Sequence, residues 1–157
     1  MKIQRVYVDT SVIGGCLDPE YAVWSEGLMR DFSDRIFRPV TSDVVQAEID
    51  LAPVPIQQKY ADLLGMKPEL LAVTPAALEL ANTYQVQGVL TPKYYNDGLH
   101  IALATIGQVD VLVSWNFRHI VHFNKIRLFN AVNIQQGYRT IQIFSPREVT
   151  TYDENSE

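Results

Sequence analysis

Residues 6–11 read Val-Tyr-Val-Asp-Thr-Ser, and the rest of the chain is organised around them. Three residues with a high preference for strands lead into an acid, which two hydroxyl residues follow. A strand that ends in this way presents the carboxylate of Asp9 at its carboxyl end. In open parallel sheets, ligands bind at that edge. The stretch therefore predicts a functional site at Asp9, although Asp-Thr-Ser is also good turn and capping chemistry.

Strand-like and helical patterns alternate along the remaining sequence. Strands are expected at residues 3–9, 35–40, 70–73, 109–114 and 140–144, and Pro39 should limit the pairing of the second. Apolar spacing and capping residues predict helices at 21–32, 42–51, 56–64, 74–88 and 91–106, and a partly helical stretch at 117–136. Strands separated by helices favour an α/β fold with a parallel sheet covered on both faces.

Length and composition indicate one globular domain. The chain has 157 residues, of which 47% are hydrophobic and 20% are charged. Residues 1–146 are expected to form the domain, and residues 147–157 are expected to be a polar, acidic and flexible tail. No apolar run is long enough to span a bilayer, so no membrane partner is expected.

Charge and cysteine content narrow the function classes. The net charge of −5 gives no global positive field, so a nucleic-acid substrate would need a local basic patch and a bound metal. The single cysteine, Cys16, excludes an intrachain disulfide and a cysteine-rich zinc site, which fits a reducing cytoplasm. The absence of a Gly-rich phosphate loop argues against a nucleoside-triphosphate enzyme.

A second acid, Glu48, lies on an apolar helical stripe. It follows Val44 and Val45 by four and three residues and precedes Leu51 by three. These side chains share one face of a helix, so the carboxylate should be buried with them. A buried, unpaired carboxylate is costly, and a cation would compensate for it. A position at the edge of the stripe, or an arginine partner, would also satisfy Glu48.

A third acid, Asp97, lies near the start of the helix expected at 91–106. The apolar stripe from residue 99 onward directs that end of the helix into the fold. A carboxylate in the first turn also interacts favourably with the helix dipole, and this is the alternative role of Asp97.

Asn116 follows the strand at 109–114 and so reaches the same sheet edge as Asp9. Its side chain could bind a metal through the carbonyl oxygen, orient a water, or cap the following helix. Asp110 begins that strand, and at about 3.3 Å per residue it should lie roughly 13 Å from the site.

Together, Asp9, Glu48 and Asp97 would suit a hard divalent cation. Carboxylates with oxygen-bearing neighbours favour Mg²⁺ or Mn²⁺. Clustered acids repel one another unless a cation is bound. A site of this kind activates water and neutralises the charge that develops on a phosphodiester during hydrolysis.

Four motifs, taken in order, resemble the PIN-domain family. They are Val-Tyr-Val-Asp-Thr-Ser-Val-Ile-Gly at 6–14, Glu48 in a helix after the second strand, Asn-Asp-Gly-Leu-His-Ile-Ala-Leu-Ala at 96–104, and Leu-Val-Ser-Trp-Asn at 112–116. Each motif alone is weakly specific, whereas the ordered set is more specific and covers nearly the whole chain.

The resemblance implies a three-layer α/β/α sandwich with a central parallel sheet of about four to five strands. It also implies a metal-dependent endoribonuclease that acts on RNA, often a VapC-type toxin that forms homodimers and is held by a cognate antitoxin. By matching motif, Asp9, Glu48 and Asp97 take the metal-binding roles. Asn116 stands where many members carry a fourth acid, which weakens the case for a second metal and for full activity.

Two rival functions stay open. One is a catalytically weak or inactive PIN-like module that acts through protein or RNA binding. The other is a phosphatase with Asp9 as nucleophile, which is disfavoured because Ser11 stands where the common version of that chemistry has a second acid.

Several other residues allow a functional or a structural role. Lys93 and Arg118 could contact a substrate phosphate or be solvated surface charges. His119 and His122 are three residues apart, a weak zinc pattern. His100 lies three residues after Asp97 and is interpreted as a satisfied helix residue rather than a base.

Overall fold

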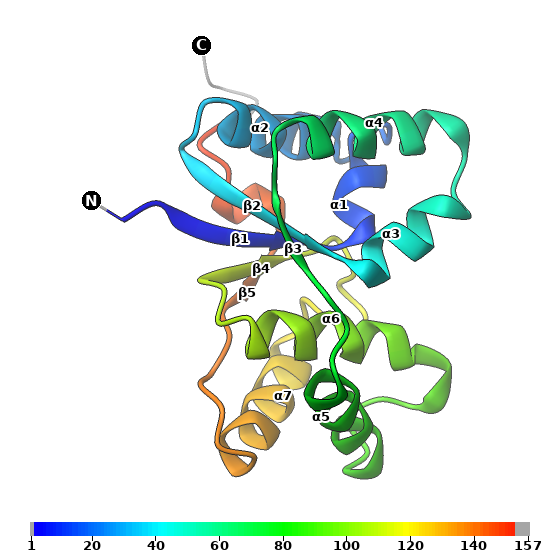
Figure 1. Ribbon diagram of the computed structural model, residues 1–157, viewed down its shortest axis with the longest axis vertical. Coiled ribbons are helices and arrows are strands. Elements are labelled where there is room, and N and C mark those ends of the chain that lie inside the picture. The colour runs from blue at the N-terminus through cyan, green and yellow to red at the C-terminus, as the bar shows by residue number, and fades with distance from the viewer. Residues whose placement is uncertain (1, 153–157) are drawn as a thin grey trace.

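The computed structural model describes residues 2–152 of the chain. A five-stranded sheet, parallel throughout, crosses the middle of the domain (Figure 1). Its strands are β1 (Gln4–Val8), β2 (Phe37–Ser42), β3 (Glu69–Leu71), β4 (Val111–Val113) and β5 (Ile143–Phe144), arranged in the order β3-β2-β1-β4-β5. The central strand β1 places Val6 opposite Pro39 of β2 and Val111 of β4.

Helices cover both faces of this sheet. The helices α2 (Ala22–Ser33) and α4 (Val54–Gly65) lie on one face, and α5 (Pro75–Val86), α6 (Tyr95–Ile106) and α7 (Phe123–Gln135) lie on the other (Figure 1). The shorter α1 (Thr10–Gly15) and α3 (Asp43–Asp50) follow the carboxyl ends of β1 and β2. This confirms the three-layer α/β/α sandwich with a central parallel sheet.

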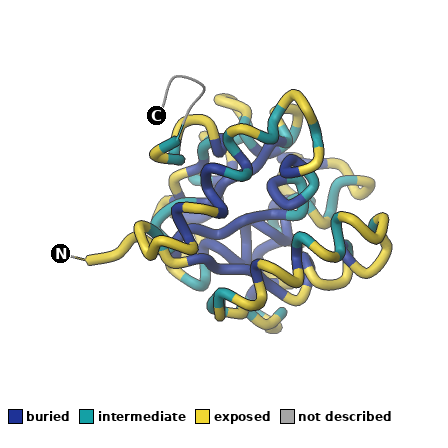
Figure 2. Tube along the Cα trace, turned by 90° about the horizontal axis from the view of Figure 1, so that it is seen from above, coloured by how far each residue is buried: buried dark blue, intermediate teal, exposed yellow. Residues whose placement is uncertain are grey.

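The core lies between the sheet and the inner faces of the helices. Tyr7, Val8, Ile101 and Leu112 are fully buried, and the buried parts of the trace run through the strands while the outer helical turns are exposed (Figure 2). Within residues 2–152, no helix has both the length and the apolar character needed to cross a membrane.

The helix starts agree with the capping residues in the sequence. Ser42 caps α3 by accepting a hydrogen bond from the Val45 N–H, and Thr74 caps α5 by accepting one from the Ala77 N–H. The strand β2 starts later than predicted because Arg35 adopts a left-handed backbone, with φ of 60°. Pro39 lies before the start of pairing with β3, which begins at Val40.

Two predicted helix starts were also wrong, and the strands expected at 70–73, 109–114 and 140–144 are shorter in the structure. The helix α4 begins at Val54 rather than at 56, because proline is tolerated in the first turn, where the N–H has no helical partner. The helix expected to run from 91 to 106 opens with a 3₁₀ turn, Pro92–Tyr94, before α6 begins at Tyr95.

The segment after β5 packs against the domain. A short helix, α8 (Pro146–Val149), contacts α2. The buried carboxylate of Asp31 then accepts hydrogen bonds from the Thr150 hydroxyl at 2.7 Å and from the Thr151 N–H at 3.0 Å. Residues 147–152 therefore belong to the packed domain and not to the predicted tail; residues 153–157 of that tail lie outside the described part.

Candidate functional site

Asp9 lies where β1 ends and α1 begins, at the carboxyl edge of the sheet. Its side chain is 4% exposed and caps α1 by accepting a hydrogen bond from the Val12 N–H. The Ser11 hydroxyl donates to Oδ1 and the Ser114 hydroxyl to Oδ2, each at 2.6 Å. Asp9 therefore both caps α1 and lies at the end of β1. Ser114, which follows β4, holds its carboxylate in place.

Glu48 reaches the same edge from α3. Its Oε1 accepts a hydrogen bond from the Thr10 hydroxyl at 2.9 Å and lies 2.6 Å from the His100 Nε2. The side chain is one-third exposed, so it lies at the border of the buried stripe. Thr10 is the residue after Asp9, so these contacts hold the two carboxylates in adjacent positions.

His100 connects the acids to the core. Its ring is 2% exposed, and its Nδ1 lies 2.7 Å from the Tyr7 hydroxyl, which in turn lies 2.7 Å from the Ser42 hydroxyl. A chain of polar contacts thus runs from β2 through β1 and α6 to Glu48. His100 is a buried helix residue with hydrogen-bond partners, as the sequence interpretation expected. One of these partners, Glu48, is a predicted site residue.

Asp97 and Asn116 complete the group. Asp97 lies in the first turn of α6, half-buried, and the Asn116 side chain is close enough to favour its charged form. The Asn116 carbonyl oxygen also accepts a hydrogen bond from the His119 N–H at 2.9 Å, so it caps the loop that follows β4. The structure therefore brings all four predicted site residues to one edge of the sheet.

The protonation behaviour of the acids shows that they share one electrostatic environment. Burial raises the pKa of Asp9 despite His100, Ser11 and Ser114, which oppose the shift. Burial also raises the pKa of Asp97, and the nearby charge of Asp9 adds to this shift. Burial acts in the same direction on Glu48, but the bonds from His100 and Thr10 outweigh it and lower the pKa of Glu48.

The donor set fits a hard cation in its chemistry, because carboxylate and amide oxygens are the ligands that Mg²⁺ and Mn²⁺ prefer. However, the side chains of this set are not already arranged around one ion position. In the described part of the chain, no three carboxylate, imidazole or thiol side chains are close enough to hold one ion. Binding of one ion by the three acids would therefore require a closer arrangement of their side chains.

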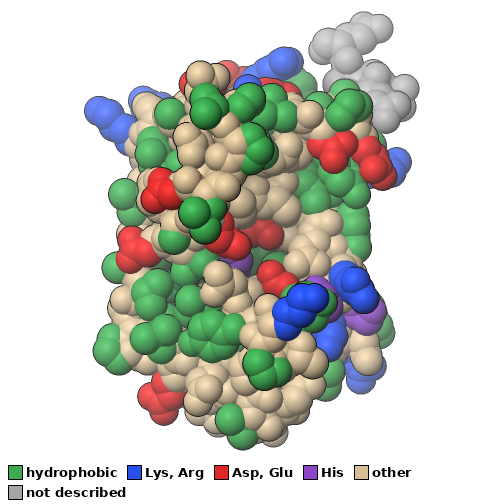
Figure 3. Space-filling view, turned by 90° about the vertical axis from the view of Figure 1, so that its right-hand side faces the viewer, with side chains coloured by type: hydrophobic (Ala, Val, Ile, Leu, Met, Phe, Trp, Pro, Cys, Tyr) green, Lys and Arg blue, Asp and Glu red, His purple; other side chains and the backbone are tan. Residues whose placement is uncertain are grey.

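A hollow of about 450 Å³ opens beside the acids. Its lining includes Glu48, Asp97 and Lys93 together with Tyr94 and Tyr95. Figure 3 looks onto this edge of the molecule and shows acidic side chains near its centre, with Lys, Arg and His side chains gathered on one side of them.

Asp97→Asn should stabilise the metal-free protein. Because the pKa of Asp97 is raised, wild-type stability falls as the pH rises from the ordinary value of 3.8 through the raised value. The amide carries no charge to bury or to repel Asp9, so its melting temperature in EDTA at pH 7 should be about 2 °C higher. Thermal unfolding at several pH values measures this difference, which should vanish at acid pH; an equal gain at all pH values would contradict the charge explanation.

Four other residues, His119, His122, Trp115 and Asp110, make contacts within the fold. His122 caps α7, while His119 packs against Tyr94 with ring centroids 3.7 Å apart, so the two histidines do not form a zinc pair. Trp115 is buried, stacked on Tyr21. Asp110 accepts a hydrogen bond from the Arg5 N–H at the opposite end of the strands, as its position predicted.

The sequence interpretation missed the contact between His100 and Glu48. The available signal was that His100 is three residues from Asp97, which places both on one face of a helix. Tyr7 gave no signal, because a tyrosine inside an apolar strand is typical of a core.

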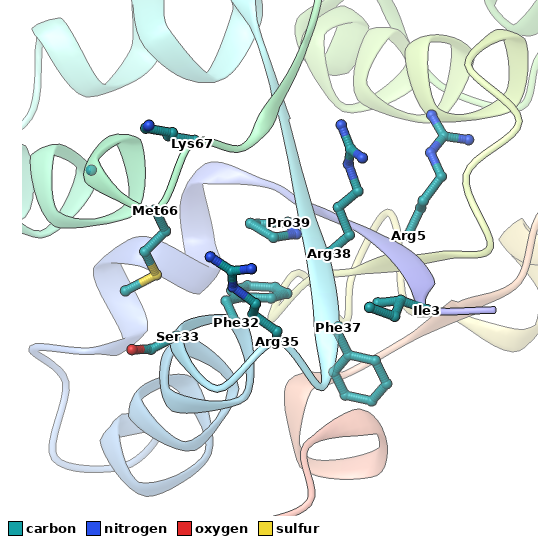
Figure 4. Close-up of a pocket in the computed structure, with 11 residues that line it drawn as sticks. Ile3, Arg5, Phe32, Ser33, Arg35, Phe37, Arg38, Pro39, Met66 and Lys67 are labelled. Carbon is teal, nitrogen blue, oxygen red and sulfur yellow. The ribbon is translucent and has the colours of Figure 1, made fainter. Parts of the chain in front are cut away.

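A second, larger hollow lies away from the acids, at the amino ends of the strands. It measures about 860 Å³, and its lining includes Arg5, Arg35, Arg38 and Lys67 (Figure 4). Arg5 is paired with Glu69 at 2.7 Å. This hollow contains none of the predicted site residues and is therefore distinct from the candidate site.

Neither a protein-family model nor a curated protein sequence matches the chain. Among solved structures, it is similar to a chain in the crystal structure of VapBC2 from Rickettsia felis bound to a DNA fragment from their promoter. The TM-score is 0.57 at 13% sequence identity, and the match covers 90% of this chain and 98% of the other. Identity this low establishes the fold alone. The chain therefore has the PIN-like α/β fold that its ordered motifs predicted.

Proposed function

We propose that this chain is a Mg²⁺- or Mn²⁺-dependent endoribonuclease that cleaves RNA phosphodiesters. The observation that carries the proposal is the convergence of Asp9, Glu48 and Asp97 at the carboxyl edge of a parallel sheet. Asp9 caps α1, Glu48 lies within α3, and Asp97 lies in the first turn of α6. Each carboxylate has polar neighbours that orient it or shift its pKa.

The chain's own residues would hold the cation and orient the acids. Ser11 and Ser114 hold both oxygens of Asp9. Thr10 and His100 both contact Oε1 of Glu48, and no hydrogen bond from a described residue reaches its Oε2, which is therefore the available ligand atom. When bound, the cation would supply an activated water and neutralise charge on the phosphate. Asn116 would contribute a neutral carbonyl oxygen in place of a fourth acid.

We infer that the protein acts as the toxin of a type II toxin–antitoxin pair. The similar Rickettsia felis chain was solved within VapBC2, bound to promoter DNA, and this supports a cognate antitoxin as the protein partner. A homodimer and a cytoplasmic location belong to the same proposal.

A specific observation favours a second candidate, a weak or inactive PIN-like binding module. The acids are too far apart in the described structure to hold one ion without movement, and Asn116 removes a charge from the site. The two candidates differ in their response to metal, because only an ion that binds the folded state raises its stability.

Cleavage of a mixed pool of structured RNAs tests the leading proposal. The purified protein should cut the pool with Mn²⁺ or Mg²⁺ and should leave it intact in EDTA. With the metal at 100 times its dissociation constant, binding should add about 2.7 kcal/mol to the free energy of unfolding. A folded protein that shows neither cutting nor metal-dependent stabilisation would instead be the binding module.

A further inference from the structure

One segment of this acidic protein has basic residues and no acidic ones. Five of its 13 Lys and Arg residues, and none of its 18 Asp and Glu residues, lie between 111 and 147. This segment therefore carries a charge of +5 and the rest of the chain −10. The segment begins with β4, and its first cation, Arg118, lies two residues after Asn116, so the positive charge begins beside the acids.

Exposed aromatic side chains accompany these cations. Phe123, at the start of α7, is 77% exposed, and Phe117 is 46% exposed. The Arg127 guanidinium lies 5.6 Å from the centroid of the Phe123 ring. Aromatic faces that are open to solvent and flanked by arginines are the features on which unpaired bases stack.

The hollow beside the acids connects to this surface through one pair of stacked rings. Lys93 and Tyr94 line the hollow with Glu48 and Asp97, and the His119 ring lies against Tyr94. The His119 Nε2 is buried and has no hydrogen-bond partner among the described residues. The stacked pair therefore joins the hollow to the loop that follows β4.

We propose that a basic rim, formed by Lys93, Tyr94, Phe117, Arg118, His119, Phe123 and Arg127, binds a single-stranded RNA segment that leads into the acidic site. The inference rests on the proposed nuclease function and extends it to the substrate. Phosphates contact the arginines and Lys93, while bases stack on Phe123 and Phe117. A duplex would fit poorly, because its base faces are already stacked.

The distribution of charge gives the strand a direction across the molecule. On the face in Figure 3, Lys, Arg and His side chains gather beside the central acids, and further acidic and basic side chains are scattered over the rest of the face. A polyanion that approaches the acids is therefore attracted over the rim.

The aromatic part of the rim can be tested by binding alone. Fluorescence anisotropy with a labelled single-stranded RNA oligonucleotide, in an Asp9→Asn background that should not cut it, gives the affinity. Phe123→Ala should weaken binding on the order of 10-fold. Ile134→Ala removes an apolar side chain that is 62% exposed on the same helix, and it should bind like its parent.

The cationic part can be tested by the salt dependence of the same binding. Each lost phosphate contact reduces the slope of log affinity against log salt by about 0.7 for single strands. Arg118→Ala with Arg127→Ala should therefore lower the slope by about 1.4. The matched control, Arg35→Ala with Arg38→Ala, removes two exposed arginines at the opposite edge and should leave the slope unchanged (Figure 4).

The outcomes separate this inference from the nuclease proposal. Equal binding by Phe123→Ala and Ile134→Ala, or a slope that depends on Arg35 and Arg38, would overturn the rim. If the wild-type chain cuts RNA with metal while the rim variants bind normally, the nuclease proposal stands and the rim proposal is wrong. If the chain binds single strands through the rim and never cuts them, the rim proposal stands and the nuclease proposal is wrong.

Discussion

Asp97→Asn should reduce metal-dependent RNA cleavage by about 1,000-fold or more. In the proposed site, the charge of this carboxylate helps to hold the cation. The cation would stabilise the reacting phosphate by several kcal/mol, and each 1.4 kcal/mol corresponds to a factor of ten in rate. The amide has nearly the same shape, so the fold should persist. Single-turnover cleavage of the RNA pool with Mn²⁺ measures the loss, and circular dichroism checks the fold.

The chain provides a matched control at the other end of the same sheet. Asp110 accepts a hydrogen bond from the Arg5 N–H at 2.7 Å and takes no part in the site. Asp110→Asn makes the same chemical change, keeps an acceptor oxygen, and should cut RNA at the wild-type rate. If Asp97→Asn retained full activity, Asp97 would not be a metal ligand, and the proposed site would be wrong.

Gly15→Ala should lower the free energy of unfolding by about 2–4 kcal/mol, the largest stability change we expect. A Cβ at Gly15 would lie 2.5 Å from the Ser25 hydroxyl oxygen and 2.6 Å from the Trp115 indole nitrogen. These two atoms are hydrogen-bonded to each other at 2.8 Å in the core. The extra methyl must therefore displace a buried side chain or break a buried hydrogen bond.

The neighbouring glycine separates crowding from helix propensity. A Cβ at Gly14 would meet only Ile56 Cδ1 at 3.8 Å, an ordinary contact, so Gly14→Ala should be neutral or slightly stabilising. Thermal unfolding should place Gly15→Ala roughly 5–15 °C below wild type. Similar melting temperatures for the two variants would show that the core around Trp115 adapts without cost.

The parts of the fold that the sequence predicted are those set by local chemistry. Ser42 and Thr74 cap their helices because a hydroxyl reaches an N–H three residues ahead, and this depends on local sequence alone. The strand that ends at Asp9 was predicted from its own residues and its neighbours. Glu48 stood out because its helical spacing placed it at the border of the core.

The parts that the sequence did not predict depend on contacts between distant residues. His100 and Glu48 are 52 positions apart, so their contact is set by how α3 and α6 approach. The packing of residues 147–152 depends on the buried carboxylate of Asp31, whose partners lie about 120 positions away. The spacing of the acids likewise depends on tertiary packing, which motif order cannot supply.

The position of β1 at the centre of the sheet determines when the site can form during synthesis. The strand β1 is made early but completes its pairing only when β4 is available. The hydrogen bond from Ser114 to Asp9 accordingly joins residues 105 positions apart. Until residues 111–114 have left the ribosome, β1 has an open edge and Asp9 lacks its partner from β4. A growing chain therefore carries no assembled acidic edge until β4 and Asn116 have been made and β4 has paired with β1.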